Sequence, residues 1–215
     1  MLSGDDLEAA FCITLNLAGV SESDQKAVHA FLAPLRCKSD VTHFHYEHSL
    51  RVGRHAWRIA QFVHLDQKAL LLAGALHDLG KCMTALETLG KTEVWSAKDY
   101  EEIRHHVVDG YRLLKGRFDF SAETILWHHR FQKDGYPKKL PKPLHEYSEG
   151  TKLLIAEHGR MLAIADVYDA LHRVNSKFGE ARALTGAEIK EKMLQFNPDR
   201  KILIEDLYKA DICSE

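Results

Sequence analysis

The stretch LLAGALHDLGKC (Leu71–Cys82) runs from six apolar or small residues directly into His77, Asp78 and Lys81. Side chains of this kind are costly to bury unless they are paired or bound to another group. A plausible N-cap, Asp66, precedes the stretch, and Gly80 is a suitable stop. The pattern therefore predicts a buried helix whose last turn carries His77 and Asp78 into a polar centre.

The remaining chain is also expected to be helical. Apolar residues recur at helical spacing, and no segment shows sustained alternation of apolar and polar residues. Further helices are predicted over residues 23–35, 48–63, 96–116, 121–131, 151–174, 186–196 and 200–210, with a long proline-rich loop over 132–150. We therefore expect an all-α fold, a single helical bundle over residues 41–215 with a short N-terminal helical extension over residues 1–40.

Composition excludes several classes of function. The 215 residues carry a net charge of −2, so the chain lacks the overall positive field that holds a nucleic-acid polymer. The four cysteines are scattered without a C-x-x-C pair, which is typical of reduced thiols. The first residues are acidic and no apolar run reaches the length of a membrane span. We expect a cytoplasmic protein that contacts neither nucleic-acid polymers nor membranes.

Histidine is the unusual component, with 14 copies. The metal-capable groups on predicted helices are His48, His77 with Asp78, His105 with His106, His128 with His129, and Asp166. Imidazole and carboxylate together suit divalent transition metals such as iron, manganese, nickel or zinc. Any one of these histidines alone is more simply a surface residue or a hydrogen-bonded core residue, and the other eight are interpreted in that way. The set as a whole indicates a metal site.

Five blocks carry a family resemblance: HSLRVGRHAWRIA, LLAGALHDLGK, RHHVVDGYRLL, WHHRFQKDGYP and RMLAIADVYDAL. In this order they resemble the successive blocks of the HD superfamily of metal-dependent phosphohydrolases, and specifically of its HD-GYP branch. The resemblance implies a helical domain and bound metal ions, most commonly iron or manganese. It also implies hydrolysis of a cyclic dinucleotide, with cyclic di-GMP the leading candidate, by attack of a metal-bridging hydroxide.

The resemblance also implies roles for individual residues. One metal ion would be held by His48, His77, Asp78 and Asp166, and Asp78 would bridge to a second ion held by His106, His128 and His129. His106 is preferred to His105 because Gly110 follows it by four residues, as in the family's block. Asp78 and Lys81 are the expected catalytic residues, with Lys81 contacting a phosphate oxygen.

Substrate contacts are expected from a second group of residues. Gly135, Tyr136 and Pro137 match the GYP signature, which lies beside the site in the family. Asp134 and Asp169 could each orient a ligand histidine, or equally be a cap or a surface charge.

The chain departs from the family pattern at three places. Arg130 stands where the family usually has glutamate, and Phe44 stands where members with three metals have a glutamate, which favours two ions here. The family's R-x-Y-R-like phosphate grip is missing, although Arg173, Lys177 and Arg182 could substitute for it. Two other functions therefore remain open: a phosphohydrolase acting on another nucleotide or a phosphomonoester, and a non-catalytic signalling or adaptor module. The expected partners are a small nucleotide and either a second copy of the chain or a regulatory protein.

Overall fold

The computed structural model describes residues 2–37, 39–91, 94–143, 145–172 and 182–213. Within these ranges the chain forms α-helices and short 3₁₀ helices and no β-strand, which confirms the all-α prediction. The elements are α1 (Gly4–Leu17), α2 (Glu22–Cys37), α3 (Asp40–Val63), α4 (Gln67–Leu76), η1 (Leu79–Met83), α5 (Leu86–Leu89), α6 (Ala97–Arg104), α7 (His106–Leu114), α8 (Asp119–Ile125), α9 (Glu149–Leu171), α10 (Gly186–Phe196), η3 (Pro198–Arg200) and α11 (Lys201–Lys209).

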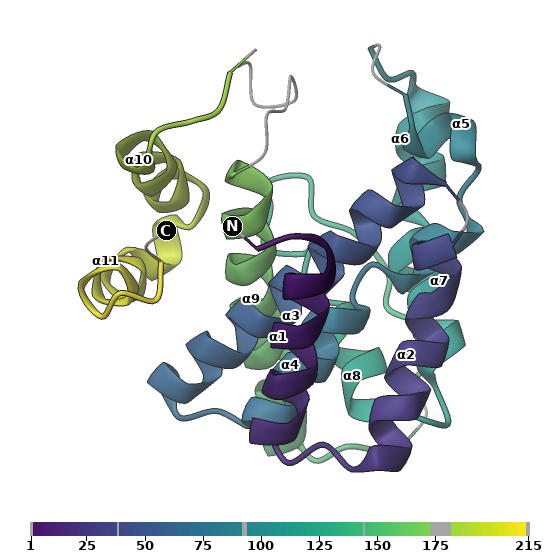
Figure 1. Cartoon of the computed structure of the whole chain (residues 1–215), viewed down its shortest axis with the longest axis horizontal. Helices are drawn as coiled ribbons and strands as arrows, with labels where there is room; N and C mark the ends of the chain where they lie inside the picture. Colours follow the sequence, from purple (N-terminus) through teal and green to yellow (C-terminus); the bar gives the residue numbers. More distant parts are fainter. Residues whose placement is uncertain (1, 38, 92–93, 144, 173–181, 214–215) are drawn as a thin grey trace.

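The two long helices α3 and α9 form the centre of the molecule, and α4 packs against both of them (Figure 1). Helices α1 and α2 cover α3 on one side, while α8 contacts α4, α7 and α9. Helices α10 and α11 lie on the far side of α9 from α7 (Figure 1). Buried apolar side chains from α1, α2, α3, α4, α7, α8 and α9 belong to one continuous core. The metal-capable residues thus sit on elements that a shared core holds in place.

The N-cap predicted at Asp66 is present, and a second N-cap is found at Ser96. The Asp66 carboxylate accepts a hydrogen bond from the amide of Ala69 at 2.9 Å. Ser96 and Asp99 form a reciprocal capping box at the start of α6. Such caps satisfy backbone donors that the first turn leaves unpaired.

The helix predicted over 48–63 begins eight residues earlier, at Asp40. Three further helix predictions were wrong in their boundaries. Residues 96–116 form two helices, α6 and α7, because the chain breaks at His105. The helix predicted over 121–131 starts at Asp119 and ends at Ile125. Helix α4 ends at Leu76, so His77 is its C-cap and not part of its last turn. In each of these three cases a histidine of the cluster lies just beyond a helix end or opens the next helix.

Gly80 explains how α7 can lie so close to η1. A Cβ at Gly80 would overlap the backbone carbonyl of His106 and lie 2.6 Å from the amide nitrogen of Gly110. Gly110 in turn packs against Gly80 and Ile125. Only hydrogen side chains allow this approach, which brings His106 next to Asp78.

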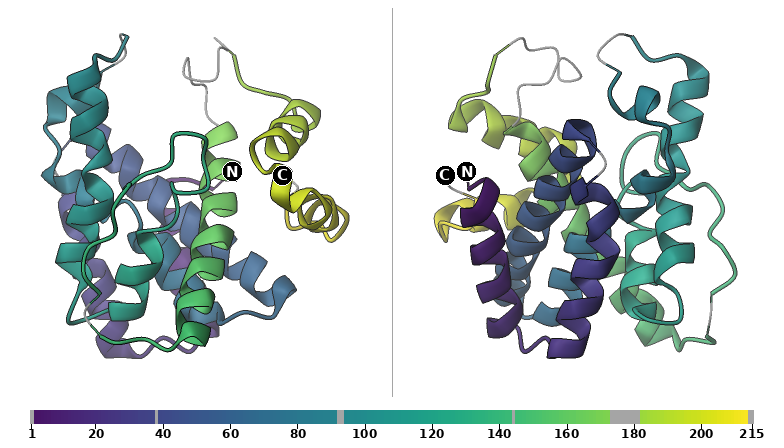
Figure 2. Two further views of the ribbon diagram at one scale, coloured as in Figure 1. Left: turned by 180° about the vertical axis from the view of Figure 1, so that it is seen from behind. Right: turned by 45° about the vertical axis from the view of Figure 1, so that its right-hand side comes forward.

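The connection from α8 to α9 runs as a long loop outside the helices (Figure 2). It spans residues 126–148, so it begins six residues before the proline-rich loop predicted over 132–150, and the last two residues of that prediction open α9. Among the described residues, no helix combines the length and the apolar character that crossing a bilayer requires.

Candidate metal centre

The seven residues predicted to bind metal come together in one cluster. His48 lies on α3, His77 and Asp78 join α4 to η1, and His106 opens α7. His128 and His129 follow α8, and Asp166 lies on α9. His48, His77, Asp78, His106 and His128 are almost completely buried, and Asp166 is 9% exposed. Five separate parts of the chain therefore deliver metal-capable side chains to one interior region.

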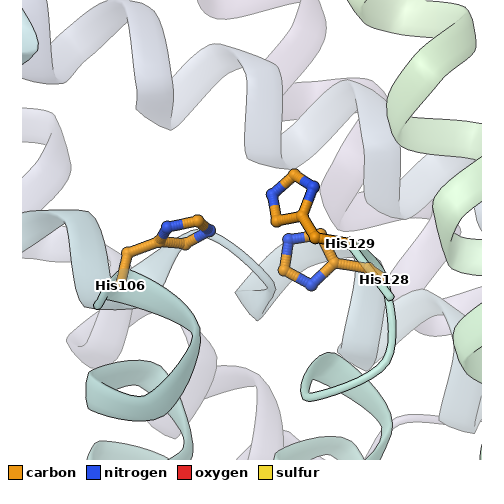
Figure 3. Close-up of side chains that lie close together, drawn as sticks. All are labelled: His106, His128 and His129. Carbon is orange, nitrogen blue, oxygen red and sulfur yellow. The ribbon is translucent and has the colours of Figure 1, made fainter. Parts of the chain in front are cut away.

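The cluster consists of three overlapping groups. The ligand atoms lie within 4.8 Å of one another in His48, His77 and Asp78, in His77, His128 and Asp166, and in His106, His128 and His129. In Figure 3 the ring of His106 faces the rings of His128 and His129 across a short gap. The sequence assigned His128 to the second ion only, whereas the structure places it beside His77 and Asp166 as well.

Three of the histidines share one local arrangement. The Nδ1 atom of His77 donates to the carbonyl of Gly74 at 2.7 Å, that of His106 to Ile103 at 2.5 Å, and that of His128 to Ile125 at 2.6 Å. Each carbonyl lies three residues earlier, in the last turn of α4, α6 or α8. These bonds satisfy carbonyls that a helix end leaves unpaired. They also fix the tautomer, so that each Nε2 carries a lone pair.

The Nε2 atoms of His77, His106 and His128 are buried and have no hydrogen-bond partner among the described residues. A buried polar atom without a partner is costly, and a bound ion is one way to satisfy it. In addition, three helix C-termini converge here, and their partial negative charges favour a cation. The donor set therefore fits divalent transition metals by its chemistry.

Asp78 lies at the centre of the cluster. Its Oδ1 is 3.3 Å from Nε2 of His106, and its Oδ2 is 3.4 Å from Nε2 of His48. Lys81 donates from Nζ to the same Oδ2 at 2.5 Å. Burial alone would raise the pKa of Asp78, but His77 and Lys81 outweigh it and hold that pKa well below its usual range. The carboxylate is thus ionised, with its two oxygens turned toward different histidines.

His106 and His128 are neutral for the opposite reason. Burial lowers the pKa of His106 to about 4 and that of His128 to about 3, although the nearby carboxylates oppose this shift. Neutral imidazole is the form that binds a metal ion.

His48 is positioned by groups that the sequence did not single out clearly. Its Nδ1 donates to Oδ2 of Asp169 at 2.7 Å, and Arg51 donates from Nε to Oδ1 of the same carboxylate, also at 2.7 Å. The Nε2 atom of His48 then faces Asp166 Oδ1 at 3.2 Å. From the sequence, Asp169 was expected to orient a ligand histidine or to be a cap or a surface charge. Arg51 was given no role. Arg51 follows His48 by three residues, a helical spacing that could have suggested it.

The GYP segment lies along one side of the cluster. The ring of Tyr136 stacks on that of His129, with centroids 4.5 Å apart and planes inclined by 26°. Arg130 donates from its guanidinium to the carbonyl of Pro137 at 2.6 Å, so the arginine that replaces the family's glutamate holds this loop. Gly135 lies so close to the Arg130 backbone that a Cβ would overlap it.

Other predicted residues lie elsewhere or outside the described residues. Asp134 and His105 are exposed. Arg173 and Lys177, suggested as phosphate contacts, fall outside the described residues. The sequence assigned no role to His45, whose Nδ1 lies 3.5 Å from Nζ of Lys81.

Comparison with known proteins places these features in a family. The 3'3'-cGAMP-specific phosphodiesterase 1 of Vibrio cholerae is 32% identical over 135 residues, which cover 60% of this chain and 29% of that protein. A cyclic di-GMP phosphodiesterase of Thermotoga maritima is 25% identical over 187 residues, covering 77% of this chain and 47% of the relative. The chain therefore spans less than half the length of these relatives.

A solved structure gives the same fold. The HD domain of the L. monocytogenes phosphodiesterase PgpH superposes with a TM-score of 0.56 at 17% identity, covering 81% of this chain and 85% of that one. The HD domain family model matches residues 45–171, the span that contains every member of the cluster. The predicted superfamily is thereby confirmed, and the chain belongs to the HD domain family.

Proposed function

We propose that this protein is a metal-dependent phosphodiesterase that hydrolyses a cyclic dinucleotide, with cyclic di-GMP as the first candidate substrate. One observation carries the proposal. In the described part of the chain the buried Nε2 atoms of His77, His106 and His128 have no hydrogen-bond partner. They share one cluster with the ionised carboxylate of Asp78, whose oxygens face His48 and His106. The names of the relatives from V. cholerae and T. maritima support the substrate class.

The ligand groups are suited to two divalent ions, for which we propose iron or manganese, with zinc and nickel as alternatives. His48, His77, Asp78 and Asp166 would hold one ion, and Asp78 would be shared with a second held by His106, His128 and His129. When bound, such a pair lowers the pKa of a water molecule and screens the phosphate oxygens that it must approach.

The chain's own residues have distinct roles in this proposal. Asp169 and the three helix-end carbonyls orient the imidazoles. The side chain of Lys81 is 15% exposed beside the buried Asp78, so its ammonium lies where a phosphate oxygen could reach it. Tyr136, with Gly135 and Pro137, forms a wall beside His129 against which a nucleotide could lie.

We further propose that residues 41–215 form the catalytic unit, with residues 1–40 as a helical extension packed on it. Arg173 and Lys177 stay candidates for gripping a phosphate. Regulation would come from a second copy of the chain or from a partner protein.

Metal analysis combined with a substrate screen tests the proposal. The purified protein should contain divalent metal and hydrolyse cyclic dinucleotides in preference to mononucleotides. Asp78→Ala should abolish turnover and lose the metal while the circular dichroism stays helical. Asp134→Ala is the matched control, since this carboxylate is exposed.

Three results would contradict parts of the proposal. Turnover of mononucleotides alone would favour a different HD-type phosphohydrolase. Bound metal without turnover of any phosphoester would favour a binding or adaptor module. Full activity of Asp78→Ala would show that the cluster is not the reaction centre.

A further inference from the structure

A hollow lies outside the metal cluster, between α7 and the loop that follows the GYP segment. Its volume is about 440 Å³, which is in the range of sites for small organic ligands. It is lined by Val108, Tyr111, Arg112, Lys115, Lys139, Leu140, Pro141, Lys142 and Pro143. None of these residues belongs to the cluster, so the hollow is a separate site.

The charged residues that line this hollow have one sign. Arg112 lies on α7 and Lys115 directly follows that helix, and Lys139 and Lys142 contribute from the loop. Arg112 pairs with Asp109 at 3.0 Å, but the three lysines form no ion pair with any carboxylate that the structure describes. Because the whole chain carries a net charge of −2, this is a local concentration of positive charge. Such a concentration attracts anions.

The rest of the lining is apolar and held in place. Val108, Leu140 and the two prolines provide carbon surface beside Tyr111. The Tyr111 hydroxyl donates to the carbonyl of Lys142 at 3.0 Å, which ties the loop to α7. This hydrogen bond joins the two sides of the hollow.

We propose that this hollow binds a nucleotide, with its phosphate on the lysines and its base on the apolar surface. A small ligand fits the volume. The lysines would bind the phosphate of a nucleotide, and the apolar lining would contact its base. The lining contains no histidine, cysteine, aspartate or glutamate, so it holds no metal ligand. The ligand is bound there without being hydrolysed.

Such a site is well placed to influence the metal cluster. Tyr136 stacks on His129 of the cluster and residues 139–143 line the hollow, so one short stretch of loop touches both. The loop runs along the outside of the helices, where a ligand can reach it (Figure 2).

Calorimetric titration of the full chain with 5'-GMP tests this proposal, and it requires no turnover, so its outcome is independent of the proposed activity. The double variant Lys115→Gln/Lys139→Gln should bind 5'-GMP at this site about tenfold more weakly than the wild type, because two charge-assisted contacts are lost. Lys201→Gln, an exposed lysine on α11, is the matched control and should bind as the wild type does. Thermal melting confirms that all variants are folded.

Equal affinity and stoichiometry in the double variant and the wild type would overturn the proposal. Binding of a poly-glutamate peptide without binding of 5'-GMP would also overturn it, and would identify the hollow as a docking site for an acidic protein segment. Equal affinities for inorganic phosphate and 5'-GMP would refute the role of the apolar surface.

Discussion

Replacing Asp169 by asparagine should weaken metal binding even though Asp169 is not itself a ligand. The carboxylate accepts two hydrogen bonds of 2.7 Å, one from His48 and one from Arg51. An amide has one oxygen and one donor group, so it can satisfy only one of these two donors. If the oxygen stays with the charged Arg51, the amide NH₂ faces Nδ1 of His48. The ring must then take the other tautomer, with a proton on the nitrogen that faces the metal.

The expected loss follows from this change. Mutation of residues that orient metal ligands typically lowers affinity by about 10- to 100-fold, which corresponds to about 1.4–2.7 kcal/mol. Competition with a chromophoric chelator for Mn²⁺, at fixed pH, measures the affinity. Asp134→Asn, at an exposed carboxylate, is the matched control.

A second substitution, at Arg51, tests whether the change of tautomer at His48 causes the loss of affinity. Arg51→Met removes the competing donor, so in the double variant with Asp169→Asn the amide oxygen is available to His48. The double variant should therefore recover most of the lost affinity, whereas Arg51→Met alone should change it by less than about threefold, since Arg51 does not touch the cluster. Asp169→Asn binding Mn²⁺ within twofold of the wild type, or no recovery in the double variant, would refute the tautomer argument.

Three further predictions concern the framework of the cluster. Gly80→Ala should destabilise the protein by roughly 3 kcal/mol or more, because the added Cβ would overlap the His106 carbonyl; Gly186→Ala, with nothing within 4 Å, should be neutral, and equal urea midpoints for the two would contradict the close approach. Tyr136→Ala should lower kcat/KM for a phosphodiester by about three- to tenfold, since His129 loses a stacked ring; Tyr136→Phe keeps the ring and should be unaffected, and equal rates in both variants would refute the stacking role. The metal-free protein should lose stability as the pH falls below about 6.5, because burial lowers the pKa of His106 to about 4 and the unfolded chain takes up the proton first. The slope should be about 1.4 kcal/mol per pH unit for each such histidine, and urea midpoints that do not change between neutral pH and about pH 5 would contradict this.

The chemistry of the cluster could be predicted from the sequence because several of its residues are neighbours in the chain. The residues of each pair, His77–Asp78 and His128–His129, are adjacent in the chain, and each pair follows an apolar run. Residue type and helical context proposed a set that contained every member of the cluster together with His105, and the family resemblance was needed to choose His106 over His105.

The contacts that orient these residues could not be predicted from the sequence, because they join residues that are far apart in the chain. His48 and Asp169 are 121 residues apart, and only the packing of α3 against α9 brings them together. The close approach of Gly80 to α7 is equally non-local. From the sequence Gly80 was interpreted only as a helix stop, whereas it lies within η1. Local patterns therefore name the ligands, whereas long-range packing decides what orients them.

The same distinction explains why the ends of α4, α6 and α8 were predicted wrongly. His77, His106 and His128 each donate Nδ1 to a carbonyl three residues earlier, so each takes the place of the backbone amide that would have continued or closed the turn. Helical periodicity continues through these histidines in the sequence, and a prediction based on it extends the helices too far. A ligand that replaces a backbone donor must sit at a helix end, where its free nitrogen points away from the helix axis into the shared interior. The boundary errors at α4, α6 and α8 thus mark the positions at which the chain gives up regular structure to build the cluster.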